Sequence, residues 1–127
     1  GKKIAILGLT FKPNTDDMRD APSLEIVPAL QKAGASLSVF DPEGMEEAKK
    51  LLSGVEWCEN VYDTLKGADA LVLVTEWNEF RSLDLPRVKQ LMKAPVMVDL
   101  RNVYSPADMV AAGFAYVGVG RPVPRKA

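Results

Sequence analysis

Short apolar segments alternate with helix-forming segments along the whole chain, and this alternation is the feature that most restricts the fold. Residues 70–74 (ALVLV) contain no polar side chain, which is typical of a strand buried on both faces of a sheet. Residues 4–7 (IAIL) form a similar run near the start of the chain. When strands and helices alternate, right-handed crossovers build a parallel sheet with helices on both faces. The sequence therefore predicts an α/β fold with a doubly wound parallel sheet in three layers.

The expected elements follow one another without repeats, and they predict one Rossmann-like domain over residues 1–122. Asn60 and Ser105 are expected to cap helices, and Pro106 to occupy a first helical position. Pro28 predicts either a kink or a late start for its helix. The proline-rich tail, residues 123–127, is expected to be frayed. We expect strands at residues 2–9, 36–40, 55–58, 69–77, 95–102 and 114–120, and helices at residues 21–35, 45–54, 60–68, 84–94 and 105–113.

Composition excludes several classes of function. The 127 residues include 16 basic and 17 acidic side chains, so no bulk attraction to nucleic acid or to an anionic membrane is expected. No apolar run is long enough to cross a bilayer, and no signal peptide is recognisable. Histidine is absent, which excludes histidine-assisted hydrolase chemistry and histidine-bearing zinc sites by this chain alone. The single cysteine, Cys58, cannot form an internal disulfide and fits a reducing cytoplasm.

Polar and aromatic residues follow several of the predicted strands, where ligands of open parallel sheets collect. They should lie on one rim of the sheet, because parallel strands end at the same edge. They are Phe11, Lys12, Asn14, Asp16, Asp17, Arg19 and Asp20 after the first strand, Asp41 after the second, Thr75, Glu76, Trp77 and Asn78 after the fourth, and Asp99, Arg101 and Asn102 after the fifth.

Lys12 and Arg101 could converge on a phosphate group, with lysine as a point charge and arginine as a planar fork. Alternatively, Lys12 and Arg19 pair with the acids of their own loop as a solvated network, which would contribute little to stability or function. Asp99 could orient or pair with Arg101, or be part of an ordinary salt-bridged strand end. From spacing alone, the solvated network of ion pairs is favoured over a phosphate site.

Asp41 stands where dinucleotide-binding folds grip a ribose hydroxyl. However, only the first glycine of the G-x-G-x-x-G turn, Gly8, is present after the first strand. Asp41 is therefore interpreted as a turn former. Trp77 and Phe80 are interpreted as covering the end of the sheet rather than stacking on a base. Cys58 is interpreted as structural, since Trp57 and Glu59 beside it offer no activation.

The charged loop also carries a family resemblance. Residues 7–23 (LGLTFKPNTDDMRDAPS) resemble the opening of the C-terminal, UDP-binding domain of the UDP-glucose/GDP-mannose dehydrogenase family. The similarity continues in order through VFDPEGM, ADALVLVTEWNEFR, VMVDLRNVY and GFAYVGVGRP, and covers the chain to about Pro122. The TEWNEF element is most similar to the UDP-glucose branch, the UDP-glucose 6-dehydrogenases.

The resemblance implies a parent enzyme with two Rossmann-like domains joined by a long central helix. Such an enzyme oxidises UDP-glucose to UDP-glucuronate with two NAD and water, through a catalytic cysteine. The NAD domain and that cysteine belong to segments that this sequence does not contain, and Cys58 does not match the cysteine's motif. No catalytic residue and no metal ligand are therefore assigned here, and this chain alone is expected to be inactive. Expected partners are UDP-glucose, the N-terminal NAD domain, and a second subunit through the central helix.

By motif, the resemblance assigns Phe11 and Lys12 to contact with the nucleotide-sugar, and Arg101 to the substrate as well. Arg19 matches the arginine that approaches NAD across the cleft between domains. The acids beside these cations are expected to hold them in place. The alternatives that stay open are a GDP-mannose or UDP-N-acetylmannosamine dehydrogenase domain, a non-catalytic nucleotide-binding or regulatory module, and a domain that serves mainly in oligomerisation.

Overall fold

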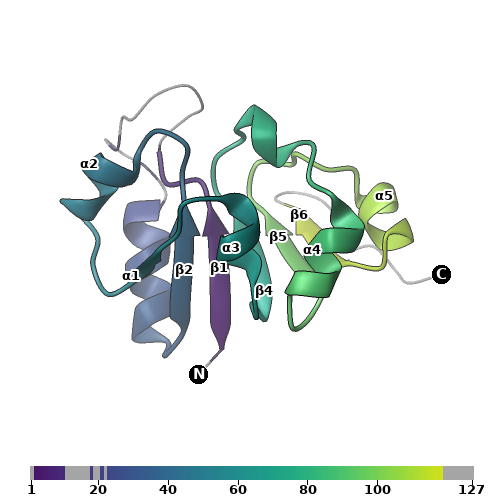
Figure 1. Ribbon diagram of the computed structural model, residues 1–127, viewed down its shortest axis with the longest axis horizontal. Coiled ribbons are helices and arrows are strands. Elements are labelled where there is room, and N and C mark those ends of the chain that lie inside the picture. The colour runs from purple at the N-terminus through teal and green to yellow at the C-terminus, as the bar shows by residue number, and fades with distance from the viewer. Residues whose placement is uncertain (1, 11–17, 19–20, 22, 119–127) are drawn as a thin grey trace.

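The computed structural model describes residues 2–10, 18, 21 and 23–118, which form a parallel sheet flanked by helices (Figure 1). Within these residues six strands lie in the order β3-β2-β1-β4-β5-β6, and every neighbouring pair is parallel. The predicted doubly wound α/β fold is thus confirmed. The strands are β1 Lys3–Leu7, β2 Ser36–Phe40, β3 Glu56–Trp57, β4 Ala70–Leu73, β5 Val96–Asp99 and β6 Ala115–Gly118; the helices are α1 Ser23–Lys32, α2 Met45–Lys49, α3 Val61–Leu65, α4 Leu85–Leu91 and α5 Pro106–Ala111, with a short 3-10 helix, η1 Asn78–Phe80, between β4 and α4.

Side chains of the central strands alternate between two apolar clusters, one on each face of the sheet. In β1, Ala5 and Leu7 belong to one cluster and Ile6 to the other, and all three are fully buried. This is why a run without polar residues forms a strand here, since both of its faces need apolar partners. The helices complete the three layers: Val27 of α1 and Ala48 of α2 join the Ile6 cluster, whereas Leu65 of α3, Val88 of α4 and Met109 of α5 join the Leu7 cluster.

Helix starts follow the predicted caps in part. The Asn60 side chain accepts a hydrogen bond from the Asp63 backbone N–H at 2.8 Å, as expected for an N-cap. Ser105 occupies the cap position of α5 without a side-chain capping bond. The late start predicted from Pro28 is wrong, because α1 begins at Ser23 and continues through the proline, whose ring is exposed.

Strand order reverses between β1 and β4, which are hydrogen-bonded neighbours in the middle of the sheet. One connection leads away from β1 toward β2, and the other leads from β4 toward β5. Loops at such a switch point diverge and leave room for a ligand outside the carboxyl ends of the strands. The strands point upward in Figure 1, so this rim is at the top of the view.

Two kinds of feature are missing from the part of the chain that the structure describes. It contains no helix that is both long and apolar enough to span a bilayer. It also contains no group of three or more Cys, Asp or Glu side chains placed to hold a metal ion.

Candidate functional site

The rim at the carboxyl ends of β1, β2, β4 and β5 is built around two buried aspartates. Asp41 follows β2 and is 1% exposed, and Asp99 ends β5 and is fully buried. A buried carboxylate is costly unless donors surround it. Both aspartates meet this requirement mainly with backbone N–H groups of the loops that line the rim, so each fixes loop conformation.

Asp41 closes its own turn, as the sequence predicted. Its Oδ1 accepts hydrogen bonds from the backbone N–H groups of Glu43 at 2.9 Å and Gly44 at 2.7 Å. This is the local pattern by which aspartate forms turns after a strand. The turn-former interpretation of Asp41 is confirmed.

The second oxygen of Asp41 reaches beyond its own loop. Oδ2 accepts from the backbone N–H groups of Leu9 at 2.7 Å and Thr10 at 3.1 Å, and the Thr10 hydroxyl lies 3.2 Å away. The Trp77 indole N–H donates to the same oxygen at 3.2 Å. One carboxylate therefore joins the loops that follow β1, β2 and β4. Sequence reasoning missed this role, because nothing in the local pattern shows which distant donors will approach.

The segment Val74–Trp77, directly after β4, lies between the other loops of the rim and contacts each of them. The Thr75 hydroxyl donates to the Thr10 carbonyl at 2.7 Å. Gly8, with φ of +93°, runs so close that an added Cβ would lie 2.6 Å from the Thr75 backbone nitrogen. The single glycine after β1 therefore serves close packing against Val74–Trp77.

Arg101 is attached to the same segment from the other side. Its Nε donates to the Val74 carbonyl at 3.0 Å and lies 3.4 Å from Glu76 Oε2. The Arg101 and Glu76 side chains are 30% and 26% exposed, so the pair is partly desolvated at the edge of the rim. The guanidinium is thus placed by its Nε over the carboxyl end of β4.

Asp99 holds the loop that carries Arg101. Its Oδ1 accepts from the Arg101 backbone N–H at 3.1 Å, and its Oδ2 accepts from the Tyr104 backbone N–H at 2.9 Å and the Tyr116 hydroxyl at 2.7 Å. Tyr104 in turn donates through its hydroxyl to the Phe80 carbonyl. Asp99 therefore orients Arg101 through the backbone, which was one of the roles considered from the sequence.

The remaining predicted site residues, Phe11, Lys12 and Arg19, lie outside the described residues. The chain on either side of their loop is well anchored. Before it, Thr10 is fully buried and bound as described above. After it, Ser23 donates from its hydroxyl to the Leu9 carbonyl at 2.6 Å, and Met18 is 5% exposed within the Ile6 cluster. Thr10, the last described residue before this loop, thus lies beside Val74–Trp77, the segment that holds Arg101.

Two aromatic residues of the rim are structural, as predicted. Phe80 is fully buried and packs edge-on against Phe40 with ring centroids 6.3 Å apart. Trp77 is 7% exposed and bound to Asp41. Beside them, burial and the nearby Asp41 carboxylate raise the pKa of Glu79. Neither ring has a free face for stacking on a base.

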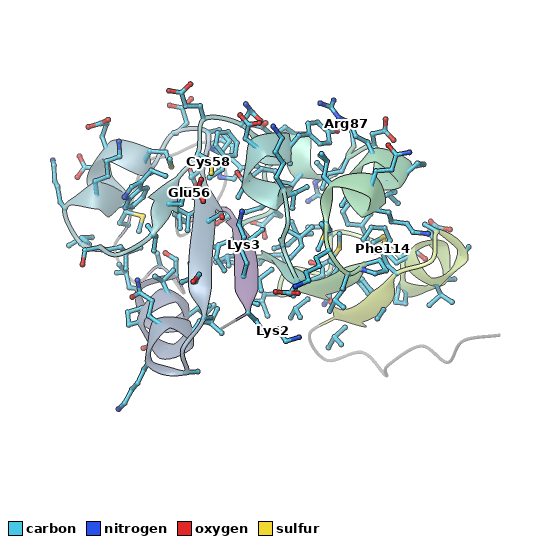
Figure 2. All side chains as sticks on the ribbon, turned by 60° about the horizontal axis from the view of Figure 1, so that its bottom comes forward. Lys2, Lys3, Glu56, Cys58, Arg87 and Phe114 are labelled. Atoms are coloured by element: carbon cyan, nitrogen blue, oxygen red, sulfur yellow. The ribbon has the colours of Figure 1, made fainter. Side chains whose placement is uncertain are left out.

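Cys58 lies in a hollow of about 460 Å³ beside α3 and the short edge strand β3. Figure 2 shows Cys58 near Glu56 and Lys3. Burial raises the pKa of the Cys58 thiol, and the Glu56 carboxylate raises it further. Lys3 is already engaged by the Lys66 carbonyl and by Glu56, at 3.9 Å. The hollow therefore has neither an activated nucleophile nor a net charge suited to a phosphate, and the structural interpretation of Cys58 holds.

Comparison with known proteins agrees with this geometry. Residues 5–106 match the model of the UDP-glucose/GDP-mannose dehydrogenase family, UDP binding domain. The chain is 56% identical over 122 residues to a UDP-glucose 6-dehydrogenase of Rhizobium meliloti, covering 96% of this chain and 28% of that protein. It is 44% identical to the UDP-glucose 6-dehydrogenase TuaD of Bacillus subtilis, covering 98% of this chain and 27% of that protein.

Solved structures give the same result. The NDP-N-acetyl-D-galactosaminuronic acid dehydrogenase from Methanosarcina mazei has a TM-score of 0.82 and 35% identity over 95% of this chain and 25% of that one. A UDP-glucose dehydrogenase from Pyrobaculum islandicum has a TM-score of 0.68 and 33% identity over 78% of this chain and 22% of that one. The chain spans just over a quarter of the length of the curated relatives. It belongs to the UDP-glucose/GDP-mannose dehydrogenase family, and what it contains is the family's UDP binding domain.

Proposed function

We propose that this chain forms the UDP-sugar-binding part of an NAD-dependent UDP-glucose 6-dehydrogenase, which converts UDP-glucose, two NAD and water to UDP-glucuronate. The observation that carries the proposal is that two loops of the rim, one containing Thr10 and one containing Arg101, are both hydrogen-bonded to the segment Val74–Trp77. Thr75 holds Thr10, two residues before Lys12, and the Val74 carbonyl holds Arg101. Thr10 and Arg101 are thus held at one edge of the sheet. We place Lys12 beside Arg101 at this edge, because a diphosphate requires more than one cation.

The roles of the cations follow from their chemistry. Arg101 offers a planar fork of donors that can bind two phosphate oxygens at once, and Lys12 adds a point charge. Phe11 supplies an apolar surface to the nucleotide-sugar. Together these residues bind and orient the substrate, while the oxidation itself takes place on groups from the rest of the polypeptide.

The residues of this chain do not form a dinucleotide site of their own. Gly8 is followed by Leu9 and Thr10 instead of the further glycines that let a backbone approach a pyrophosphate. Both carboxylate oxygens of Asp41 accept hydrogen bonds from backbone and indole donors. Asp41 is therefore not available to bind a ribose hydroxyl, as the acid at this position does in dinucleotide-binding folds. We therefore place NAD mainly on a separate N-terminal domain, with Arg19 approaching it across the interdomain cleft.

The chemistry also requires a nucleophile from outside this chain. Cys58 is buried with a raised pKa, so it is poorly suited to attack an aldehyde. The chain alone is expected to bind UDP without turning over UDP-glucose. Its complete form is expected in the cytoplasm, as a dimer formed through the central helix.

Titration calorimetry with UDP, UDP-glucose, GDP and NAD tests this proposal directly. We expect heats of binding with UDP and UDP-glucose and weaker binding of GDP and NAD. Affinity should be modest, because half of the cleft that encloses the ligand belongs to the other domain. Preference for GDP would assign the chain to a GDP-mannose enzyme, and preference for NAD would contradict the proposal. Size-exclusion chromatography with and without UDP separates a binding domain from an oligomerisation scaffold.

A further inference from the structure

Asp41 connects more of the rim than its position in a turn requires. The carboxylate is 1% exposed and uses both oxygens, Oδ1 within its own turn and Oδ2 outside it. The partners of Oδ2 come from the loop after β1, through Leu9 and Thr10, and from the segment after β4, through Trp77. A residue needed only for a turn would use its own loop's N–H groups and leave the other oxygen in water.

A carboxylate is the side chain that this arrangement requires. It has two acceptor oxygens and no donor, and both oxygens here face N–H groups. An asparagine has one acceptor oxygen, and its amide nitrogen would point hydrogens at the N–H groups of either Leu9 or Gly44. Replacing Asp41 with asparagine must therefore release one of the two loops, whichever way the amide turns.

Thr10 is the residue through which Asp41 acts on the ligand loop. Its N–H binds Asp41, its carbonyl accepts from Thr75, and its methyl group packs closely against Gly44, where an added Cβ would lie 2.4 Å away. Thr10 is fully buried and directly precedes Phe11 and Lys12 in the chain. The direction in which the chain leaves the sheet toward Lys12 is thus fixed on three sides.

We propose that Asp41 is a positioning residue for nucleotide binding, which sets the start of the Lys12 loop against the segment that holds Arg101. The proposal rests on the proposed function, because it takes UDP as the ligand of the rim. In this proposal Asp41 does not touch the ligand; it holds Leu9 and Thr10 against Trp77 of the segment that holds Arg101. Loss of this contact therefore weakens UDP binding while the sheet and its two apolar clusters persist.

The test is UDP binding by Asp41→Asn, measured by calorimetry beside the unaltered chain. Asp69→Asn is the matched control, because Asp69 Oδ2 also accepts a backbone N–H, from Lys3 at 2.9 Å, at the opposite edge of the sheet. We expect the dissociation constant for UDP to rise at least about tenfold in Asp41→Asn, since one of two loops loses its charged acceptor, and to change less than about twofold in Asp69→Asn. Amide hydrogen exchange should accelerate in Asp41→Asn either at Leu9 and Thr10 or at Glu43 and Gly44, depending on which way the amide turns, with exchange in β6 unchanged.

The outcomes separate the two proposals. If the unaltered chain binds no UDP, the proposed function fails, and the role of Asp41 fails with it. If the unaltered chain binds UDP and Asp41→Asn binds it equally well, only the role of Asp41 is contradicted. Should Asp41→Asn not fold, Trp77→Phe removes a single donor and keeps an aromatic ring in place. It should weaken UDP binding about threefold, and unchanged binding would overturn the proposal.

Discussion

Gly8 and Thr75 meet across the two central strand ends, so closely that an added Cβ on Gly8 would lie 2.6 Å from the Thr75 Cβ. This contact brings the loop after β1 against the segment Val74–Trp77, and the hydrogen bond from Thr75 to Thr10 continues it. In many doubly wound folds a glycine here lets the backbone approach a ligand. In this protein the glycine lets one loop of the rim approach another.

The first prediction concerns this contact. Gly8→Ala should lower the free energy of unfolding by about 3–5 kcal/mol, because a positive φ is strained for alanine and the new methyl group overlaps Thr75. Gly34→Ala is the matched control: its φ is +92°, against +93° at Gly8, but no atom lies within 4 Å of the added Cβ. It should cost only the backbone strain, about 1–2 kcal/mol. Urea denaturation measures the free energy of unfolding of both variants. Equal losses would show that the close contact with Thr75 does not contribute to the cost of Gly8→Ala.

The second prediction tests Arg101 as a ligand-binding residue. Arg101→Ala should raise the dissociation constant for UDP at least about tenfold, because a charge-assisted contact with phosphate is lost. Glu76→Gln should raise the same dissociation constant by only about threefold, because the Val74 carbonyl still holds the Nε of Arg101. Arg87→Ala serves as the control, because Arg87 belongs to α4 and its guanidinium stacks over Tyr62, 4.0 Å from the centroid of the ring. Calorimetry that shows equal affinities for Arg101→Ala and Arg87→Ala would exclude Arg101 from the site.

The third prediction concerns the support beneath Arg101. Tyr116→Phe removes the hydroxyl that donates to Asp99 at 2.7 Å in a fully buried setting. We expect a loss of about 1–3 kcal/mol in the free energy of unfolding, because the buried carboxylate oxygen loses a donor. Tyr62→Phe, whose hydroxyl accepts from the Asp84 N–H at an exposed position, should stay within about 0.5 kcal/mol. Thermal or urea unfolding measures the loss of stability in both variants. Similar losses in Tyr116→Phe and Tyr62→Phe would show that burial of the hydroxyl does not matter.

The fourth prediction concerns the Cys58 thiol. Burial raises its pKa above the ordinary value of 9.0, so the native protein holds less thiolate than the unfolded chain at the same pH. Ellman's reagent at pH 8 should therefore react more slowly with the native chain than with the chain in urea. Equal rates would show that the thiol is neither buried nor shifted.

The same shift makes stability depend on pH. As pH rises through 9.0, the unfolded chain loses the Cys58 proton first, and it then binds fewer protons than the native state. The free energy of unfolding should therefore fall with rising pH between that value and the raised native pKa. Burial raises the pKa of Tyr104 as well, so the Cys58 contribution is read as the difference between the unaltered chain and Cys58→Ala. A difference that stays constant from pH 7 to pH 11 would contradict the shift.

The sequence alone determined the fold, because hydrophobic period is a local property. Residues 70–74 are apolar throughout, which is typical of a central strand with two covered faces, and β4 indeed lies between β1 and β5. Helix starts were predicted where a cap acts within one turn, as at Asn60. At Pro28 the alternative of a late helix start was wrong, because α1 begins at Ser23 and continues through the proline.

The tertiary structure alone decided how the rim is held together. Asp41 stands 31 residues from Thr10 and 36 from Trp77 in the chain, yet its single oxygen Oδ2 binds both. Arg101 reaches back 27 residues to the Val74 carbonyl. No sequence period encodes such bonds, since they depend on which strands become neighbours when the sheet forms. The sequence placed Asp41, Asp99 and Arg101 after their strands, and the parallel arrangement of the strands brought these residues to one edge of the sheet.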